Sequence, residues 1–146
     1  MRRLTSGDER RFLGMLDLFA TVFDEPGTYG AKRPGPHYIA RLLANPAFVG
    51  LVALDGERIV GALAAYELPK FEQERSEFYI YDLAVAEGYR RRGIATSLIA
   101  ETKAIAERRG GWVVFVQADR GDDPAINLYS GLGTREEVLH FDIRVE

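Results

Sequence analysis

The chain has 146 residues, a formal net charge of −3 and no cysteine. A chain of this length forms one domain that buries roughly 70% of its unfolded surface, its negative charge argues against general nucleic-acid binding, and the lack of cysteine excludes disulfides and fits a reducing compartment. No apolar run is long enough to span a membrane, and the first residues lack the apolar core of a signal peptide, so we expect a soluble, cytoplasmic protein with no membrane partner.

The first third of the chain predicts two helices and a long loop. Ser6 and Glu9 have the spacing of a capping box, which marks the start of a helix. The apolar residues of this helix recur at helical spacing: Phe12, Leu16, Phe19 and Phe23. Residues 24–36 contain three prolines and three glycines, which predicts a loop of a length that is functional or mobile in compact domains. A short helix follows at about residues 37–44.

Three strands and a helix are predicted next. The apolar runs 48–54 and 59–68 are separated by the hairpin signal Asp55-Gly56-Glu57-Arg58. Residues 77–85 are rich in tyrosine, isoleucine and valine, which favour strands. After a turn that contains glycine and arginine, residues 94–109 have the pattern of an amphipathic helix.

The last part of the chain predicts a strand, a helix and a final strand. An apolar run that ends at Gln117 predicts a buried strand over 112–118, and Asp123-Pro124 begins a helix because proline is well placed in a first turn. Residues 137–145 alternate between apolar and polar side chains, which predicts a strand. The order ααβββαβαβ predicts an α/β fold in which helices flank a mixed, mostly antiparallel sheet.

The turn before the helix at 94–109 is a candidate anion site. The first backbone N–H groups of a helix lack partners and carry the positive end of the helix dipole, so they bind phosphates. Gly93 lets the backbone approach a phosphate closely, and Ala95 keeps the next position small. Spacing alone supports a solvated turn equally well, and the glycine patterns of nucleotide P-loops and dinucleotide-binding loops are both missing.

Charge is distributed unevenly over the second half of the chain. Arg90, Arg91 and Arg92 form a basic cluster, whereas residues 117–146 contain seven acidic and three basic residues. This distribution suits one anionic and one cationic ligand, although ordinary solvated surface is the simpler explanation.

The strand and turn carry a resemblance to a known family. Arg90-x-x-Gly93-x-Ala95 after Leu83-Ala84-Val85 resembles the acyl-CoA signature of the GNAT superfamily of N-acetyltransferases. The order of elements resembles that fold along the whole chain, which implies a single N-acetyltransferase domain over residues 1–146.

Further stretches are similar to one branch of this superfamily. The segment from Asp123 to Gly133 is similar to the superfamily's later helix, with Thr134 in place of its usual closing phenylalanine and Asp122 where many members have asparagine. Residues 61–85, 116–125 and 135–143 resemble the type I aminoglycoside 3-N-acetyltransferases, the gentamicin-modifying group. This resemblance implies transfer of an acetyl group from acetyl-CoA to the 3-amino group of an aminoglycoside, which would confer resistance.

The resemblance implies where acetyl-CoA binds. In this superfamily the strand before the turn splays from its neighbour and pantetheine lies in the gap, so the backbone of Leu83, Ala84 and Val85 is expected to pair with it. A backbone N–H of these residues is also expected to stabilise the thioester oxygen. The pyrophosphate is expected on seven residues: Arg90, Arg91, Arg92, Gly93, Ile94, Ala95 and Thr96.

Two residues are candidates for proton transfer. An amine attacks only when it is neutral, so an ammonium group has to lose a proton first. Asp82, beside the expected splay point, is the first candidate base; a structural aspartate at a β-bulge is the alternative. Tyr129 matches the superfamily's general acid, which protonates the departing thiolate; a core tyrosine is the alternative. A phenol suits that role because it is neutral at working pH.

The acceptor is expected to be a small polycationic amine. Four acidic residues are candidates for holding its ammonium groups: Asp119, Asp122, Asp123 and Asp142. Tyr81 is a further candidate, but strand parity puts Tyr79 and Tyr81 opposite Ile80 and Asp82 unless a bulge intervenes, so only one of these sets can face the substrate. The loop 24–36 could cover the acceptor. Two isolated histidines without a carboxylate cluster predict no metal site.

Two other functions remain open at this point. The protein could acetylate another amine, such as a polyamine or a protein, or it could be a GNAT-fold module that binds acyl-CoA without catalysis. An apolar final strand and an exposed aromatic edge are also compatible with a homodimer, which is common in this superfamily.

Overall fold

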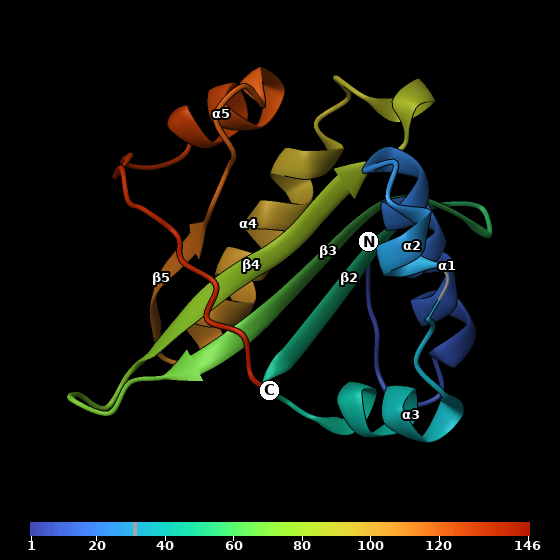
Figure 1. Ribbon diagram of the computed structural model, residues 1–146, viewed down its shortest axis with the longest axis horizontal. Helices are drawn as coiled ribbons and strands as arrows, with labels where there is room; N and C mark the ends of the chain where they lie inside the picture. Colours follow the sequence, from blue (N-terminus) through green and yellow to red (C-terminus); the bar gives the residue numbers. More distant parts are fainter. Residues whose placement is uncertain (31) are drawn as a thin grey trace.

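Five strands form one sheet in the order β1-β2-β3-β4-β5 in this computed structural model, which describes residues 1–30 and 32–146 (Figure 1). The strands are β1 (Arg2–Arg3), β2 (Phe48–Asp55), β3 (Arg58–Pro69), β4 (Ser76–Val85) and β5 (Gly111–Val116). Neighbours are antiparallel, except that β4 and β5 are parallel. The predicted mixed, mostly antiparallel sheet is therefore confirmed.

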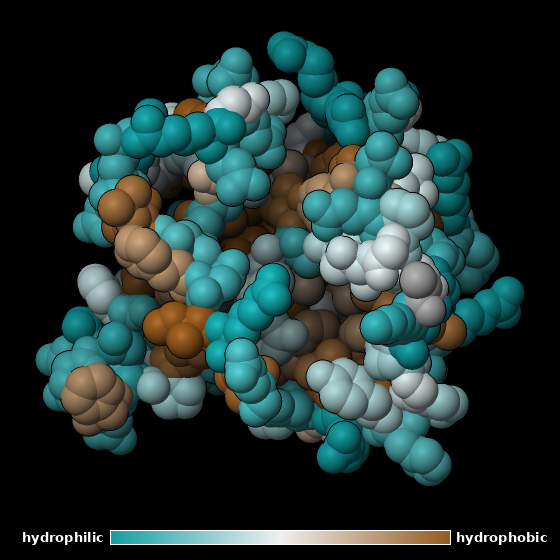
Figure 2. All heavy atoms as spheres, in the orientation of Figure 1, coloured by the Kyte–Doolittle hydropathy of each residue, from teal (hydrophilic) through white to brown (hydrophobic). Residues whose placement is uncertain are grey.

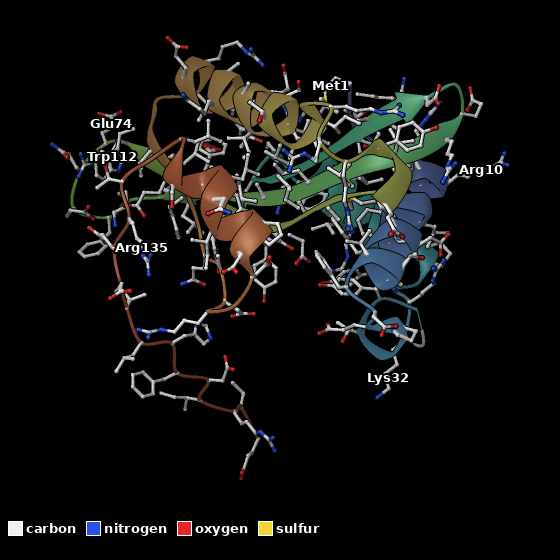
Figure 3. All side chains as sticks on the ribbon, turned by 90° about the horizontal axis from the view of Figure 1, so that it is seen from above. Met1, Arg10, Lys32, Glu74, Trp112 and Arg135 are labelled. Atoms are coloured by element: carbon white, nitrogen blue, oxygen red, sulfur yellow. The ribbon has the colours of Figure 1, made fainter. Side chains whose placement is uncertain are left out.

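Helices lie on both faces of this sheet. They are α1 (Glu9–Val22), α2 (Pro26–Tyr29), α3 (Pro36–Ala44), α4 (Ile94–Arg108) and α5 (Asp123–Ser130), with a 3-10 turn η1 (Glu87–Tyr89). Figures 1 and 3 show α4 on one face, α1 on the other, and α5 beside the edge formed by β5. The predicted α/β architecture with flanking helices is thus what the chain forms.

Period-2 alternation divides the strand residues between two cores. In β2, Phe48 and Val52 pack with α1 and α3, and we call this cluster the α1 core. Val49 and Leu51 of the same strand pack with Leu98 and its neighbours in α4, and we call that cluster the α4 core. Burial of these apolar side chains is the main stabilising contribution to the sheet and its helices.

The start of α1 differs from the predicted capping box. Asp8, not Ser6, precedes the helix, and no side chain caps it. The Asp8 side chain is only 3% exposed; its carboxylate accepts hydrogen bonds from the Thr5 N–H and from Arg2, both at 2.8 Å, and from Arg11 at 3.2 Å. Burial raises the pKa of Asp8, but these bonds hold it below its usual value. The Ser6 cap was wrong because Asp8 anchors the turn instead.

The end of the chain differs most from the prediction. Residues 134–146 contain no strand, so the predicted strand over 137–145 was wrong. The strand predicted as buried over 112–118 is β5, an edge strand whose Trp112 is 54% exposed. Both differences have one cause. An alternating or apolar segment becomes a buried strand only if neighbouring strands pair with it, and within the described residues no strand pairs with the outer edge of β5.

Two short elements were not predicted. β1 pairs with Leu51 and Val52 of β2, and α2 lies inside the segment 24–36 that was predicted as a loop. Ala31, which belongs to that predicted loop, lies outside the described residues. No helix in the described part of the chain is long and apolar enough to cross a membrane.

Candidate active site

A bulge in β4 decides which side chains face the site. Ile80 and Asp82 pair with consecutive residues of β3, so Tyr81 between them has no partner in that ladder. A bulge of this kind shifts the side-chain alternation by one residue. Ile80 accordingly packs in the α4 core and Ala84 in the α1 core. Tyr79, Tyr81 and Asp82 therefore share the α1 side of the sheet, which is the exception that the parity argument allowed for a bulge.

Asp82 is held by a tyrosine from α2. The Tyr29 hydroxyl donates a hydrogen bond to Asp82 Oδ2 at 3.0 Å, and the Tyr29 ring lies 5.7 Å from the rings of both Phe19 and Phe23. Burial raises the pKa of Asp82, the bond from Tyr29 opposes this, and the charge of Glu25 adds to the rise. The carboxylate is therefore more basic than an exposed aspartate.

Aromatic rings extend the surface beside Asp82. The Tyr81 ring lies 6.1 Å from that of Tyr66 and 5.6 Å from that of Tyr79, and Tyr79 stacks on Phe115 of β5 at 4.7 Å. The Tyr79 hydroxyl donates to Gln117 Oε1 at 2.6 Å. Aromatic faces next to a carboxylate form a suitable surface for ammonium groups.

β4 and β5 separate next to this surface. Their pairing covers only Ser76 to Ile80 of β4, whereas β4 continues to Val85 paired with β3 alone among the described residues. The backbone of Leu83, Ala84 and Val85 therefore faces a gap on the β5 side. This open edge is the predicted splay, and an extended ligand with amide groups fits there because it can pair with strand backbone.

The turn after β4 leads into the start of α4. Gly93 has φ 78°, a left-handed conformation that favours glycine, and no side chain caps the helix that begins at Ile94. The Ile94 side chain points to the sheet, where a Cβ on Gly61 would lie 2.6 Å from it. Because Gly61 pairs with Val85, this contact places the start of α4 near the end of β4, and its first N–H groups, including those of Ala95 and Thr96, suit a phosphate group.

The three arginines of the turn have different surroundings. Arg90 Nε donates to the carbonyl oxygen of Val85 at 3.4 Å, Arg92 lies over the Tyr89 ring at 5.0 Å, and Arg91 has φ 62°. All three stay at the surface of the turn, where they attract anions.

Tyr129 lies on α5 and packs against the α4 core, as does Leu83. Burial raises the pKa of Tyr129, and the charge of Asp122 adds to this, so the phenol stays protonated and can donate a proton. Asp82 bonds to Tyr29 of α2, whereas its neighbour Leu83 and Tyr129 both pack against the α4 core, and Asp82 and Tyr129 make no direct hydrogen bond.

The structure places the four acidic candidates apart from Asp82. Asp122 accepts a hydrogen bond from the Ala125 N–H at 3.4 Å and caps α5, while Asp119 and Asp123 are exposed on either side of it. Asp142 lies in the segment 134–146, with its side chain 90% exposed and Oδ1 2.9 Å from His140 Nε2.

Sequence reasoning missed several residues of the site, notably Tyr29 as the partner of Asp82, and Tyr66. The bulge had a signal in the sequence: the polar Asp82 interrupts a run of alternate apolar positions at Phe78, Ile80 and Ala84. Such an interruption indicates either a functional polar group or a shift of parity, and here the parity shifts at Tyr81.

The surface around the site is hollowed. In Figure 2, hydrophobic residues line the hollowed middle of this face and hydrophilic residues surround it. A separate open hollow lies between α1 and η1, and of the predicted site residues only Arg90 lines it. Within residues 1–30 and 32–146, no group of three or more acidic or histidine side chains is placed to hold a metal ion.

Comparison with known proteins gives relatives of similar fold. The chain is 52% identical to a solved aminoglycoside acetyltransferase from an uncultured soil metagenomic sample, with a TM-score of 0.97 over 99% of this chain and 97% of that one. A second such enzyme from soil, solved in complex with sisomicin, is 33% identical with a TM-score of 0.92, over 99% of this chain and 95% of that one.

A curated relative is named as another kind of acetyltransferase. An N-alpha-acetyltransferase of Sulfurisphaera tokodaii is 33% identical over 114 residues, which are 69% of this chain and 65% of the relative, so the chain matches less than two thirds of that relative's length. The model of the "Acetyltransferase (GNAT) family" matches residues 14–134. Because that match includes β2 to α5 and the whole candidate site from Tyr29 to Tyr129, the chain belongs to the acetyltransferase (GNAT) family.

Proposed function

We propose that the protein transfers an acetyl group from acetyl-CoA to an amino group of an aminoglycoside and so confers resistance. The observation that carries the proposal is the bulge in β4, which puts Asp82 on the same side of the sheet as Tyr79 and Tyr81, next to the gap between β4 and β5. The 52% identity to an aminoglycoside acetyltransferase supports the acceptor class.

The position on the acceptor is a finer part of the proposal. The resemblance of residues 61–85, 116–125 and 135–143 to the type I aminoglycoside 3-N-acetyltransferases favours the 3-amino group of gentamicin. Of these stretches, 61–85 contains the bulge and 116–125 contains Gln117, which accepts a hydrogen bond from Tyr79, whereas Asp142 in 135–143 lies apart from Asp82.

The chain's own residues fit acetyl-CoA, which supplies an acetyl thioester when bound. The unpaired backbone of Leu83 to Val85 would hold pantetheine, and the start of α4 with Arg90 to Thr96 would hold the pyrophosphate. A backbone N–H beside the gap would also stabilise negative charge that develops on the thioester oxygen.

Two side chains would move protons. Asp82 would accept a proton from the acceptor ammonium, directly or through water, while Tyr29 keeps the carboxylate oriented by its bond to Oδ2. Tyr129 would donate its phenol proton to the leaving thiolate, which its burial permits because the phenol remains neutral.

The acceptor would lie on the tyrosine surface beside Asp82. Tyr81 offers an exposed ring. Glu25 adds a negative charge, which also raises the pKa of Asp82. Asp119, Asp122 and Asp123 would attract further ammonium groups from the start of α5.

A protein amino terminus is the second candidate acceptor. The N-alpha-acetyltransferase of Sulfurisphaera tokodaii supports this candidate, because the same proton acceptor and gap would serve any primary amine. A polyamine acceptor would be acetylated by the same proton transfers. A non-catalytic module that only binds acyl-CoA would not need Asp82 or Tyr129 for proton transfer.

The test is an acceptor panel. We would incubate the purified protein with acetyl-CoA and gentamicin, spermidine or a peptide with a free amino terminus, follow thiol release, and locate the acetyl group on the product by NMR. We expect turnover of gentamicin with the acetyl group on its 3-amino nitrogen, and a raised inhibitory concentration in a susceptible bacterium that expresses the protein. Turnover of the peptide with no turnover of gentamicin would contradict the proposal, and no turnover of any amine would favour the binding module.

A further inference from the structure

Two residues in the turn before α4 have a left-handed backbone. This turn comprises residues 86–94, and we call it the η1–α4 turn. Gly93 has φ 78° and Arg91 has φ 62°. The conformation of Arg91 is the less favourable of the two, because only glycine adopts a positive φ without steric cost. Backbone strain of this kind persists only where the surrounding structure holds it.

The backbone bonds of the η1–α4 turn do not extend to these two residues. The last bond between backbone groups of the turn is donated by the Arg90 N–H to the Glu87 carbonyl oxygen, at 3.4 Å. Among the described residues, no backbone carbonyl accepts a bond from the N–H groups of Arg91, Arg92 or Gly93. The conformation of this part of the turn therefore depends on contacts from elsewhere in the fold.

The hairpin between β2 and β3 supplies contacts at both ends of the turn. At its start, the Ala86 N–H donates to the Val60 carbonyl oxygen at 2.8 Å. At its end, the Ile94 side chain lies against Gly61, where an added Cβ would be 2.6 Å from it. Residues 55–61, which we call the hairpin segment, therefore fix the two ends of the η1–α4 turn.

Tyr89 makes the contact in the middle of the turn. Its hydroxyl donates a hydrogen bond to Asp55 Oδ2 at 2.6 Å, and its half-buried ring packs against the α1 core. The Arg58 guanidinium lies over this ring at 5.4 Å and the Arg92 guanidinium at 5.0 Å. A phenol that donates to a carboxylate gains electron density in its ring, so the bond to Asp55 also strengthens the attraction for both cations.

The charge around Tyr89 suits an anion. Two guanidinium groups share one ring and the carboxylate of Asp55, so the local balance is positive. The other carboxylate of the hairpin segment, Glu57, pairs with Arg11 of α1 at 3.7 Å. Arg92 is thus held over a neutral ring, and its charge remains directed to ligands of the turn.

We propose that Asp55 and Tyr89 are positioning residues for the phosphates of acetyl-CoA, because their hydrogen bond holds the η1–α4 turn in the conformation that binds them. The inference rests on the proposed function, since it takes acetyl-CoA as the ligand of this turn. It goes beyond that function by assigning part of the cofactor's affinity to the hairpin segment, which lies outside the gap between β4 and β5.

Calorimetric titration with CoA tests the positioning without measuring activity. Tyr89→Phe removes the hydroxyl and keeps the ring, and Asp55→Ala removes the acceptor. Each variant should keep the native circular dichroism spectrum and raise the Kd for CoA about 3- to 10-fold, the range that one hydrogen bond is worth. Glu57→Ala is the matched control, because it removes a carboxylate from the same hairpin segment and should keep the native Kd. A native Kd in Tyr89→Phe and Asp55→Ala would overturn the inference.

Pantetheine separates an effect on the turn from an effect on the whole gap. It lacks the phosphates and the adenosine of CoA, so its Kd should be the same in the native chain, in Tyr89→Phe and in Asp55→Ala. Chemical-shift titration of ¹⁵N-labelled protein measures this weaker binding. An equal loss of affinity for pantetheine and for CoA would contradict the inference, because the variants would then disturb more than the phosphate contacts.

The double variant tests whether the two residues act through one bond. Because that bond can be lost only once, the Kd of Tyr89→Phe/Asp55→Ala for CoA should equal the Kd of the single variants. If the two single effects multiply instead, the side chains act separately, and the proposed pair is overturned.

Kinetics give the last readout. In both single variants the KM for acetyl-CoA should rise while kcat at saturating acetyl-CoA stays native, because Asp82 and Tyr129 are untouched. A lowered kcat at unchanged KM would contradict a positioning role. Failure of the proposed function gives a different result: a native chain that binds no CoA contradicts that function and this inference with it, whereas equal CoA binding by every variant contradicts the positioning alone.

Discussion

Asp82 combines a half-buried position with a hydrogen bond from Tyr29. Burial makes its charged form less favourable, and the bond from Tyr29 partly compensates, so its pKa stays above the ordinary aspartate range. A base is active when deprotonated, so activity should fall as the pH drops through this raised pKa. The same shift costs stability as pH rises, because the folded state binds this proton more tightly than the unfolded state does.

Asp82→Asn separates a catalytic from a structural aspartate. Asparagine keeps an oxygen that can accept the Tyr29 bond but cannot take up a proton, so kcat should fall about 10²- to 10⁴-fold. The Tm at neutral pH should be unchanged or higher, since no charge is buried. Steady-state kinetics and thermal melts measure both, with Glu74→Gln on the β3–β4 loop as an exposed control. A lowered Tm with native kcat would make Asp82 a structural residue.

Tyr29→Phe tests the partner of that carboxylate. The lost hydrogen bond no longer lowers the pKa of Asp82, so the acidic limb of the kcat profile should move to higher pH. Well above that limb, kcat should return close to the native value because Asp82 itself is intact. A profile of native shape at uniformly lower kcat would mean that Tyr29 supports the fold of α2 and does not tune Asp82.

Tyr129→Phe should reduce kcat by about 10²-fold or more, because it removes the proton donor to the thiolate. The KM for acetyl-CoA should change little, since the ring and its packing against the α4 core remain. Kinetics with saturating acceptor provide the measurement. Unchanged kcat would assign protonation of the thiolate to water or to another group.

At the scale of elements, the site depends on two backbone irregularities. The bulge at Tyr81 turns Asp82 toward α2, and the left-handed Gly93 turns the chain into α4. The conformation of Gly93 is not required by packing, since a Cβ at this position would meet nothing within 4 Å. Their role is to place β4 and the start of α4 around one gap.

Gly93→Ala tests the second irregularity. An alanine in the left-handed region costs about 1–2 kcal/mol, which should lower the Tm and, by displacing the first N–H groups of α4, raise the KM for acetyl-CoA. Gly88→Ala is the matched control, because Gly88 also has nothing within 4 Å of a Cβ but no positive φ. Equal KM values in the two variants would show that the turn does not depend on this conformation.

At the scale of the molecule, the gap divides the sheet between β4 and β5. A ligand that binds there only in the folded state should stabilise the whole domain, by about 2.7 kcal/mol at a concentration 100 times its Kd. Thermal melts with increasing CoA should therefore show a rising Tm, and Gly93→Ala should need more CoA for the same shift. A Tm independent of CoA would contradict a CoA site in this gap.

Local patterns were sufficient for much of the fold. The three central strands and α4 lie within one residue of their predicted bounds, because alternation and helical periodicity are strong in these segments. The turn with Gly93 was also recognisable, since its glycine and arginines are contiguous. The prediction of a Ser6 cap failed because the buried Asp8 accepts hydrogen bonds from Thr5, Arg2 and Arg11 together. Two of these donors, Arg2 and Arg11, come from different elements, β1 and α1.

Local sequence patterns were enough to predict the α/β class, the central strands, and the candidate strand, turn and helix around Leu83 to Thr96. Three features could not be predicted from them: Tyr79, Tyr81 and Asp82 share one face, Tyr29 is the partner of Asp82, and residues 134–146 form no strand. The physical reason is that helix and strand periodicity are properties of neighbours in the chain. A bulge, a hydrogen bond between residues 29 and 82 and the pairing of a sheet edge depend on segments that meet only when the chain has folded.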